Sequence, residues 1–138
     1  MKFVTLGLVV SALAFAAPAN AQDVDAGANV FKRCGACHAV GEGAKNKVGP
    51  ELNELFGRVA GTLPDYSYSK AMVEAGQAGL VWDPETLAPY LRKPKEHVPG
   101  TKMAFAGLNN PDELANVIAY LQTFSPPAAA APATAPAP

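Results

Sequence analysis

The chain has 138 residues, of which 49% are hydrophobic, and its formal net charge is −1. This near-neutral balance excludes the basic signature of a nucleic-acid-binding protein. Residues 22–124 lie between an N-terminal and a C-terminal segment of different composition, and they are enough for one small domain. The stability of a domain of this size usually benefits from a disulfide, a metal or a cofactor.

The first 21 residues are typical of a secretory signal. Lys2 supplies the positive start, residues 3–17 form an uncharged and mostly apolar run, and residues 19–21 (Ala-Asn-Ala) form a small-x-small cleavage site. A membrane anchor is the alternative, but the run is short for a bilayer span and no second run follows. We therefore expect a signal peptide over residues 1–21, and export, most simply to a bacterial periplasm. Loss of Lys2 leaves 10 basic residues against 12 acidic ones, a net charge of −2.

Helix signals then follow in order along the domain. Residues 24–36 carry Ala, Val and Phe with few breakers, and Asp23 and Asp25 suit the start of a helix. Residues 41–64 contain repeated Gly and Pro, which predicts mainly loop with a short helical turn at residues 51–56.

Three further helices are expected. Ser67 can cap a helix that runs to about residue 75, where Gly76 ends it. Asp83 followed by proline opens a helix to about residue 92, and Asn110 followed by proline repeats that signal. The last helix has an apolar face at i, i+3, i+4 and i+7, formed by Leu114, Val117, Ile118 and Leu121. With no convincing alternating strand, the sequence predicts a small all-α domain whose long loops need something to pack against.

The final residues, 125–138, contain only Ala, Pro, Ser and Thr. They offer no large apolar side chain to bury, and their prolines disfavour regular helix. We expect a flexible Ala/Pro-rich tail without a site.

The segment RCGACHAV holds both cysteines of the chain, Cys34 and Cys37, followed directly by His38. A structural zinc site needs four ligands, and His97 is the only other candidate; adjacent Cys37 and His38 would also struggle to share one tetrahedral ion. A redox dithiol fits an exported protein and the Cys-x-x-Cys spacing. However, no strand-rich thioredoxin context is visible, and His38 would have no task.

Covalent haem attachment uses all three residues. In a helical turn, Cys34 and Cys37 are i, i+3 neighbours on one face, so their thiols can add to the two vinyl groups of one porphyrin. His38 is i+4 from Cys34, and its imidazole can reach the iron from the same side. Cys-x-x-Cys-His is the attachment signature of c-type haem, and we favour this interpretation over zinc and the dithiol.

The sequence also resembles the soluble class I c-type cytochromes, especially the short bacterial mono-haem electron carriers. The resemblance runs from about residue 27 to residue 121, through segments in the family's order: GANVFKRCGACHAV, VGPELNELFGRVAG, YSYSKAM, VWDPETL, YLRKPKEHVPGTKMAFAGL and ELANVIAYL. It implies the class I cytochrome c fold over residues 22–124, with helices and long loops wrapped around one covalently bound haem c. Gly27 and Phe31 would pack against Val117 and Tyr120.

The resemblance implies Met103, after PGTK, as the second axial ligand opposite His38, with Phe105 against the haem edge. Once Met1 leaves with the signal, Met72 is the only competing thioether. His97 is the rival ligand, but the family usually has an aromatic residue there, which favours a packed or surface histidine.

Further roles follow by position in the family. The carbonyl group of Pro50 would accept a hydrogen bond from His38 and fix its ring. Tyr90 would lie near the methionine sulfur. Buried haem propionates need donors or a cation, and the resemblance supplies five residues for them: Arg58, Tyr68, Ser69, Trp82 and Thr101.

Two positions depart from the family pattern. Met72 stands where many relatives have an asparagine near the methionine side of the haem, which is expected to alter internal water and the reduction potential. Pro89 cannot donate to the carbonyl group of Glu85, so we expect it to bend or loosen that helix and to disturb the neighbouring Tyr90.

Iron bound by both His38 and Met103 has no open position. This predicts a one-electron carrier rather than an enzyme, and Met/His ligation raises its reduction potential. Two alternatives remain at this point. A labile Met103 would allow a haem enzyme or gas binder of the peroxidase type, and the chain could also be the haem module of a larger dehydrogenase.

Basic residues lie in segments that flank the haem crevice in this family, and we favour a basic ring over the alternative of ordinary solvated lysines. They are Lys32, Arg33, Lys45, Lys47, Lys70, Lys93, Lys95 and Lys102. A basic ring would favour membrane redox complexes with acidic docking surfaces. The expected donor is of the quinol–cytochrome c reductase kind, and the acceptor an oxidase or a photosynthetic reaction centre. We expect a monomer, with neither nucleic acid nor a substrate as partner.

Overall fold

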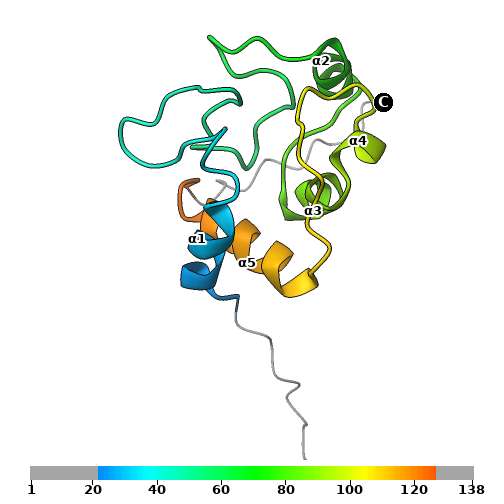
Figure 1. Cartoon of the computed structure of the whole chain (residues 1–138). Coiled ribbons are helices and arrows are strands. Elements are labelled where there is room, and N and C mark those ends of the chain that lie inside the picture. The colour runs from blue at the N-terminus through cyan, green and yellow to red at the C-terminus, as the bar shows by residue number, and fades with distance from the viewer. Residues whose placement is uncertain (1–21, 127–138) are drawn as a thin grey trace, which may run out of the picture.

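The computed structural model describes residues 22–126 (Figure 1). The predicted signal peptide and residues 127–138 of the predicted tail lie outside the described residues. Five helices occur in the described part of the chain: α1 (Val24–Phe31), α2 (Lys70–Gln77), α3 (Pro84–Arg92), α4 (Pro94–His97) and α5 (Pro111–Gln122). In this range the only β-structure is an isolated bridge between Val59 and Val81. The all-α prediction is therefore confirmed.

The first and last helices cross at close range, as Figure 1 shows for α1 and α5. A Cβ atom on Gly27 would lie 2.0 Å from the carbonyl oxygen of Asn116, so only glycine permits this approach. Beside the crossing, the rings of Phe31 and Tyr120 pack with centroids 5.4 Å apart. This contact fixes Phe31 against the end of α5, and the attachment segment, residues 34–38, begins three residues further on.

Helix α1 begins where predicted, because the Asp23 side chain accepts a hydrogen bond from the Ala26 amide group at 2.9 Å. The helix ends at Phe31 rather than at residue 36, which corrects the prediction. After Phe31 the chain tightens into turns: the Cys34 amide donates to the Phe31 carbonyl oxygen at 2.7 Å. The His38 amide still donates to the Cys34 carbonyl oxygen at 2.9 Å, so the i, i+4 relation survives in one local turn.

Helix α2 differs from its prediction at both ends. Ser69, not Ser67, caps it, since the Ser69 side chain accepts from the Met72 amide at 3.2 Å. Gly76 lies inside the helix rather than after it. A Cβ there would lie 1.9 Å from the carbonyl oxygen of Ala60, so this glycine marks a close backbone contact instead of a helix end.

Helix α3 opens with a reciprocal capping box: the Thr86 amide donates to the Asp83 side chain at 2.7 Å, and the Asp83 amide donates to the Thr86 hydroxyl oxygen at 2.9 Å. Helix α3 continues through Pro89 to Arg92, so the proline does not end the helix. Both Pro89 and Glu85 are exposed, so the missing backbone donor of Pro89 falls at a solvent-exposed position of α3.

Two other segments were not foreseen correctly. Helix α4 was not predicted, and the predicted turn of helix at residues 51–56 is a series of non-helical turns. Glu54 in that series has φ 53°, a left-handed conformation that a helix cannot contain.

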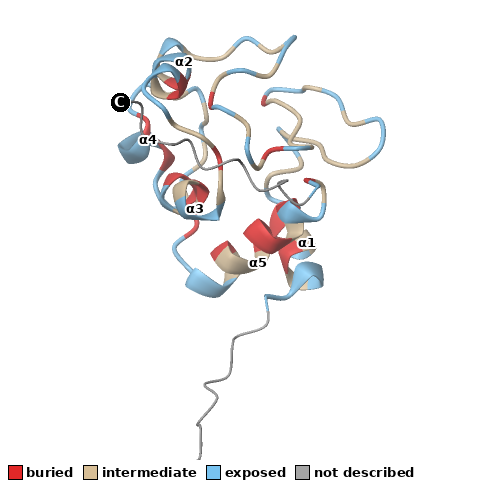
Figure 2. Cartoon of the chain, turned by 180° about the vertical axis from the view of Figure 1, so that it is seen from behind, coloured by how far each residue is buried: buried red, intermediate tan, exposed pale blue. Residues whose placement is uncertain are grey.

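Each of the five helices carries buried positions, while much of the long loop between α1 and α2 is only partly covered (Figure 2). Among the largest fully buried side chains are Leu108 and Val117, which also line the central cavity. Ser125, the first residue of the predicted tail, is buried, and its hydroxyl oxygen accepts from the Phe56 amide at 3.3 Å. Within residues 22–126, no helix combines the length and apolar character needed to cross a membrane.

Candidate haem site

A cavity of about 330 Å³ lies at the centre of the domain, within the range of about 300–1,000 Å³ common for ligand and cofactor sites. Its walls come from the end of α1, the long loop, α2, α3, the segment before α5 and α5 itself. Most of the lining is apolar. All twelve of the predicted site residues line it: Cys34, Cys37, His38, Pro50, Arg58, Tyr68, Ser69, Trp82, Tyr90, Thr101, Met103 and Phe105.

The attachment segment forms one wall of the cavity. Nδ1 of His38 lies 2.7 Å from the carbonyl oxygen of Pro50. Because a carbonyl group only accepts, Nδ1 carries the hydrogen and Nε2 keeps its lone pair. Gly49 packs on the ring, where a Cβ would lie 2.4 Å from Cε1 of His38. Burial lowers the pKa of His38, although the Pro50 bond opposes this, and a neutral imidazole is the form that binds metal.

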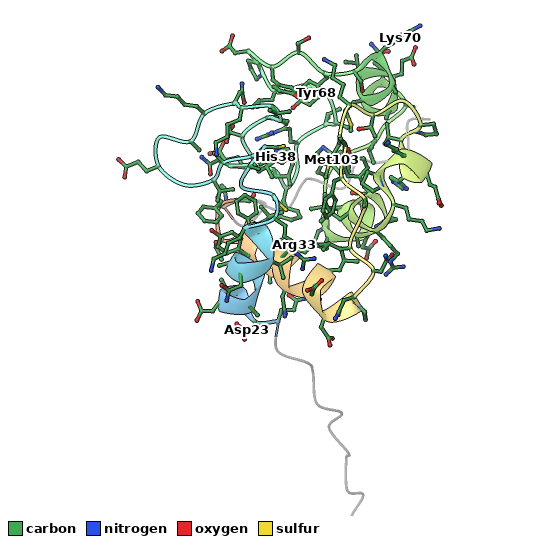
Figure 3. The ribbon with its side chains drawn as sticks, viewed as in Figure 1. Asp23, Arg33, His38, Tyr68, Lys70 and Met103 are labelled. Atoms are coloured by element: carbon green, nitrogen blue, oxygen red, sulfur yellow. The ribbon has the colours of Figure 1, made fainter. Side chains whose placement is uncertain are left out.

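Met103 lies on another wall, and Figure 3 shows it near His38 in the middle of the molecule although the two belong to distant segments. The hydroxyl group of Tyr90 donates to Sδ of Met103 at 3.4 Å and lies 2.9 Å from Oγ1 of Thr101. The Met103 amide in turn donates to Oγ1 of Thr101 at 3.3 Å. The thioether is therefore held by side chains from α3 and from its own loop.

The two rival ligands are placed differently. Met72 is buried and lines the cavity, so a second thioether is close to the site. His97 is exposed at the end of α4, does not line the cavity, and has its ring centroid 6.3 Å from that of Tyr90. Among residues 22–126, no group of three or more His, Cys, Asp or Glu side chains is arranged to hold a metal ion by itself.

Arg58, Tyr68 and Ser69 are polar residues of the cavity lining. Arg58 donates to the carbonyl oxygen of Asn53 and, at 3.4 Å, to that of Glu51. Burial raises the pKa of Tyr68, and the neighbouring Arg58 cation opposes this shift. Ser69 also lines the cavity, but its hydroxyl group already caps α2.

The sequence reasoning missed Glu51 as a residue near the site. Its Oε1 lies 3.7 Å from Nη2 of Arg58, and both side chains are largely shielded, with 19% and 13% of their surface exposed. No motif or periodicity marks this glutamate. Only the path of the loop from Pro50 to Arg58 brings the two charges together.

The donor set fits a covalently attached haem. Two free thiols, an imidazole with one nitrogen engaged, and a thioether all line one apolar cavity. The guanidinium of Arg58 and several hydroxyl groups in the same lining suit the two carboxylates that a haem carries. These are the residues that haem requires, and they lie together.

Comparisons with known proteins agree with this geometry. Residues 24–125 match the cytochrome c family. The chain is 61% identical over 99 residues to cytochrome c2 of Agrobacterium tumefaciens (strain II Chrys), covering 72% of this chain and 89% of the relative. It is 60% identical over 101 residues to cytochrome c2 of Afifella marina, covering 73% and 82%. The solved structure of cytochrome c2 from Rhodospirillum Centenum superposes with a TM-score of 0.73 at 42% identity, covering 75% of this chain and 99% of that one.

The chain therefore belongs to the cytochrome c family, and its cofactor is one covalently bound haem c with its iron. Within the family it is a bacterial class I c-type cytochrome of the c2 and c-550 kind, which makes it an electron carrier.

Proposed function

We propose that this cytochrome is a periplasmic carrier that shuttles single electrons between membrane redox complexes, with His38 and Met103 as the axial ligands of its haem. The supporting observation is that an imidazole and a thioether from distant segments line one cavity, each with its own hydrogen-bond partner. Pro50 orients the first, and Tyr90 orients the second.

Cys34 and Cys37 are the attachment residues in this proposal. Both are free thiols in the turn that precedes His38, and both line the cavity. Burial raises the pKa of Cys34, while the neighbouring Arg33 cation opposes that shift. The short turn fixes the spacing of the two sulfur atoms relative to the imidazole.

Arg58, Tyr68, Ser69, Trp82 and Thr101 hold the haem propionates in this proposal. A carboxylate in a largely apolar cavity needs hydrogen-bond donors or a cation, since burying it alone is costly. Arg58 supplies charge, and the others supply O–H or N–H groups. Phe105 contributes apolar surface at the edge of the cavity.

The haem iron supplies the one-electron chemistry. The residues of the chain hold the ligands, exclude water and leave no position for a substrate. An enzyme or gas binder would need Met103 to leave, yet its thioether and its amide group are both hydrogen-bonded. We therefore favour a carrier without enzymatic activity over a peroxidase-like enzyme or a dehydrogenase module.

The location and partners follow from the ends and the surface of the chain. The first 21 residues support export to the periplasm, and curated relatives are named cytochrome c2. The exposed lysines favour acidic docking surfaces, with a quinol–cytochrome c reductase as donor and an oxidase or reaction centre as acceptor. A monomer is the form that exchanges partners fastest.

The test uses the mature protein from cells that attach c-type haem. The intact mass should exceed that of the polypeptide by one haem, and acid–acetone should leave the pigment on the protein. The oxidised form should show the red-region absorption of sulfur-bound iron, and the reduced form should not bind carbon monoxide. Extractable pigment would contradict covalent attachment, and ready carbon monoxide binding would favour the enzyme or gas binder.

A further inference from the structure

Arg58 separates two different environments. On one side it lines the central cavity. On the other it faces Glu51, which lines an open polar groove at the surface together with Lys45, Asn46 and Asp65. The guanidinium therefore stands between the haem cavity and a carboxylate that the cavity does not contain.

Glu51 is held firmly in this place. Its Oε2 accepts a hydrogen bond from the Asn53 amide at 2.7 Å, and its own amide donates to Oδ1 of Asn46 at 2.9 Å. Its carbonyl oxygen accepts from Nη1 of Arg58 at 3.4 Å, while its Oε1 lies 3.7 Å from Nη2. The side chain and the main chain of Glu51 thus both contact the guanidinium group of Arg58.

The partial burial of the pair gives this contact weight. Ion pairs on the open surface contribute little because water and salt screen them. Only 19% of the Glu51 side chain and 13% of the Arg58 side chain are exposed, so solvent screens this pair less. Arg58 has five N–H donors, which allows it to serve Glu51, the loop carbonyl groups and a further carboxylate at once.

We propose that Glu51 is a positioning residue that lowers the reduction potential of the haem by sharing Arg58 with a propionate. This inference rests on the proposed role of Arg58 as a propionate partner. Glu51 fixes the guanidinium at the cavity wall and offsets part of its positive charge. The Glu51 carboxylate therefore reduces the positive electrostatic potential that Arg58 produces at the haem.

The sign of the effect follows from charge. Reduction adds one electron to the site, and a nearby uncompensated cation favours that step. Removing the charge of Glu51 leaves Arg58 uncompensated on that side and frees it to bind the propionate more strongly. Both changes stabilise the reduced form, so the potential should rise.

The experiment compares the midpoint potentials of the holoprotein and three variants by spectroelectrochemical titration at fixed pH and salt. Glu51→Gln keeps the size of the side chain and its acceptor oxygen but removes the charge. Glu51→Asp keeps the charge on a shorter side chain. Glu54→Gln is the matched control, because Glu54 is an exposed glutamate of the same loop whose only recorded hydrogen bond is from its amide to the Phe124 carbonyl oxygen.

We expect Glu51→Gln to raise the potential clearly, Glu51→Asp to raise it less, and Glu54→Gln to leave it nearly unchanged. A shift in Glu51→Gln no larger than in Glu54→Gln would overturn the proposal. A larger shift in Glu51→Asp than in Glu51→Gln would do the same, because it would show that side-chain fit in the loop matters and charge does not.

Dependence on Arg58 is tested by adding Arg58→Gln to the wild type and to Glu51→Gln. If Glu51 acts through Arg58, the shift caused by Glu51→Gln should shrink in the Arg58→Gln background; an equal or larger shift would contradict the proposal. Failure of the proposed function can be distinguished from failure of this inference, because the wild type would then lack covalent haem or the red-region band. With both present and no Glu51 effect, only this inference fails.

Discussion

The hydroxyl group of Tyr90 lies 3.4 Å from Sδ of Met103 and 2.9 Å from Oγ1 of Thr101. One buried side chain of α3 therefore holds two residues of the loop that carries the proposed iron ligand. Pro89 precedes this tyrosine without displacing it, because the helix continues through the proline to Arg92. The position of the thioether depends on α3 as much as on its own loop.

Tyr90→Phe should lower both the stability and the reduction potential. The loss of a buried hydrogen bond costs about 0.5–1.5 kcal/mol in free energy of unfolding. The O–H group also draws electron density from the sulfur, so its removal makes the thioether a better donor to oxidised iron. Denaturant unfolding and redox titration measure the two effects. Tyr120→Phe is the control, since that ring packs on Phe31 and Phe124 away from the ligand; an equal fall in potential in both variants would contradict the explanation.

Met103→Ala should abolish the red-region absorption of the oxidised protein, lower its potential and allow carbon monoxide to bind the reduced form. The reason is that the only sulfur held by Tyr90 would be gone. Met72→Ala is the matched comparison, because Met72 is a buried thioether that lines the same cavity. We expect it to retain the band. If Met72→Ala loses the band and Met103→Ala keeps it, the ligand assignment is wrong.

Gly27→Ala should destabilise the domain by about 2–3 kcal/mol, at the upper end of what overpacking usually costs. The new Cβ would lie 2.0 Å from the Asn116 carbonyl oxygen and 2.8 Å from Cβ of Tyr120, so α1 and α5 would have to separate. Gly35→Ala is the control: the nearest atom to its Cβ is 3.5 Å away, an ordinary contact. Thermal unfolding of the holoproteins compares them, and similar midpoints for both variants would refute the tight crossing.

The sequence predicted those parts of the fold that local rules govern. The caps at Asp23, Asp83 and Asn110 are where their side chains and the following residues place them, because capping needs only neighbours in the chain. The four-residue helix α4 was missed because it is too short for any apolar periodicity. Gly76 was misread because the sequence does not show that Ala60 passes beside it.

Only part of the candidate site follows from local rules in the sequence. The spacing of Cys34, Cys37 and His38 is local chemistry, while Met103 and the propionate residues came from family resemblance. Neither local spacing nor the family resemblance predicted the pairing of Glu51 with Arg58. It arises because the loop returns on itself and is fastened by Asn46 and Asn53, a path that no periodic pattern encodes.

The lysines beside the cavity lead to the last prediction. Of the basic residues named above, Arg33 and Lys102 line the cavity; Arg33 is paired with Glu113 at 2.6 Å, and Nζ of Lys102 donates to the Ser67 carbonyl oxygen at 2.7 Å. Lys70 is 88% exposed and lies 3.5 Å from Glu74, which already offsets its charge. Lys102 is therefore the strongest candidate for steering a partner to this face, and Lys70 is a natural control.

Electron transfer to an acidic partner should slow as salt rises, because salt screens attraction between charges beyond about 8–10 Å. Lys102→Glu and Lys95→Glu should slow it much more than Lys70→Glu at low salt, since association rates follow the charge that faces the partner. Stopped-flow kinetics over a range of ionic strength measures this, with redox titration and the red-region band as checks that the haem site is unchanged. The band matters most for Lys102→Glu, which also breaks the bond to Ser67, and a lost band would mean that its slow rate reports a damaged site. Lys95 is exposed on α4, and its side chain forms no hydrogen bond or ion pair within residues 22–126, so its reversal mainly tests charge. An electron-transfer rate that changes neither with salt nor with any of the three charge reversals would reject electrostatic docking and indicate an apolar contact instead.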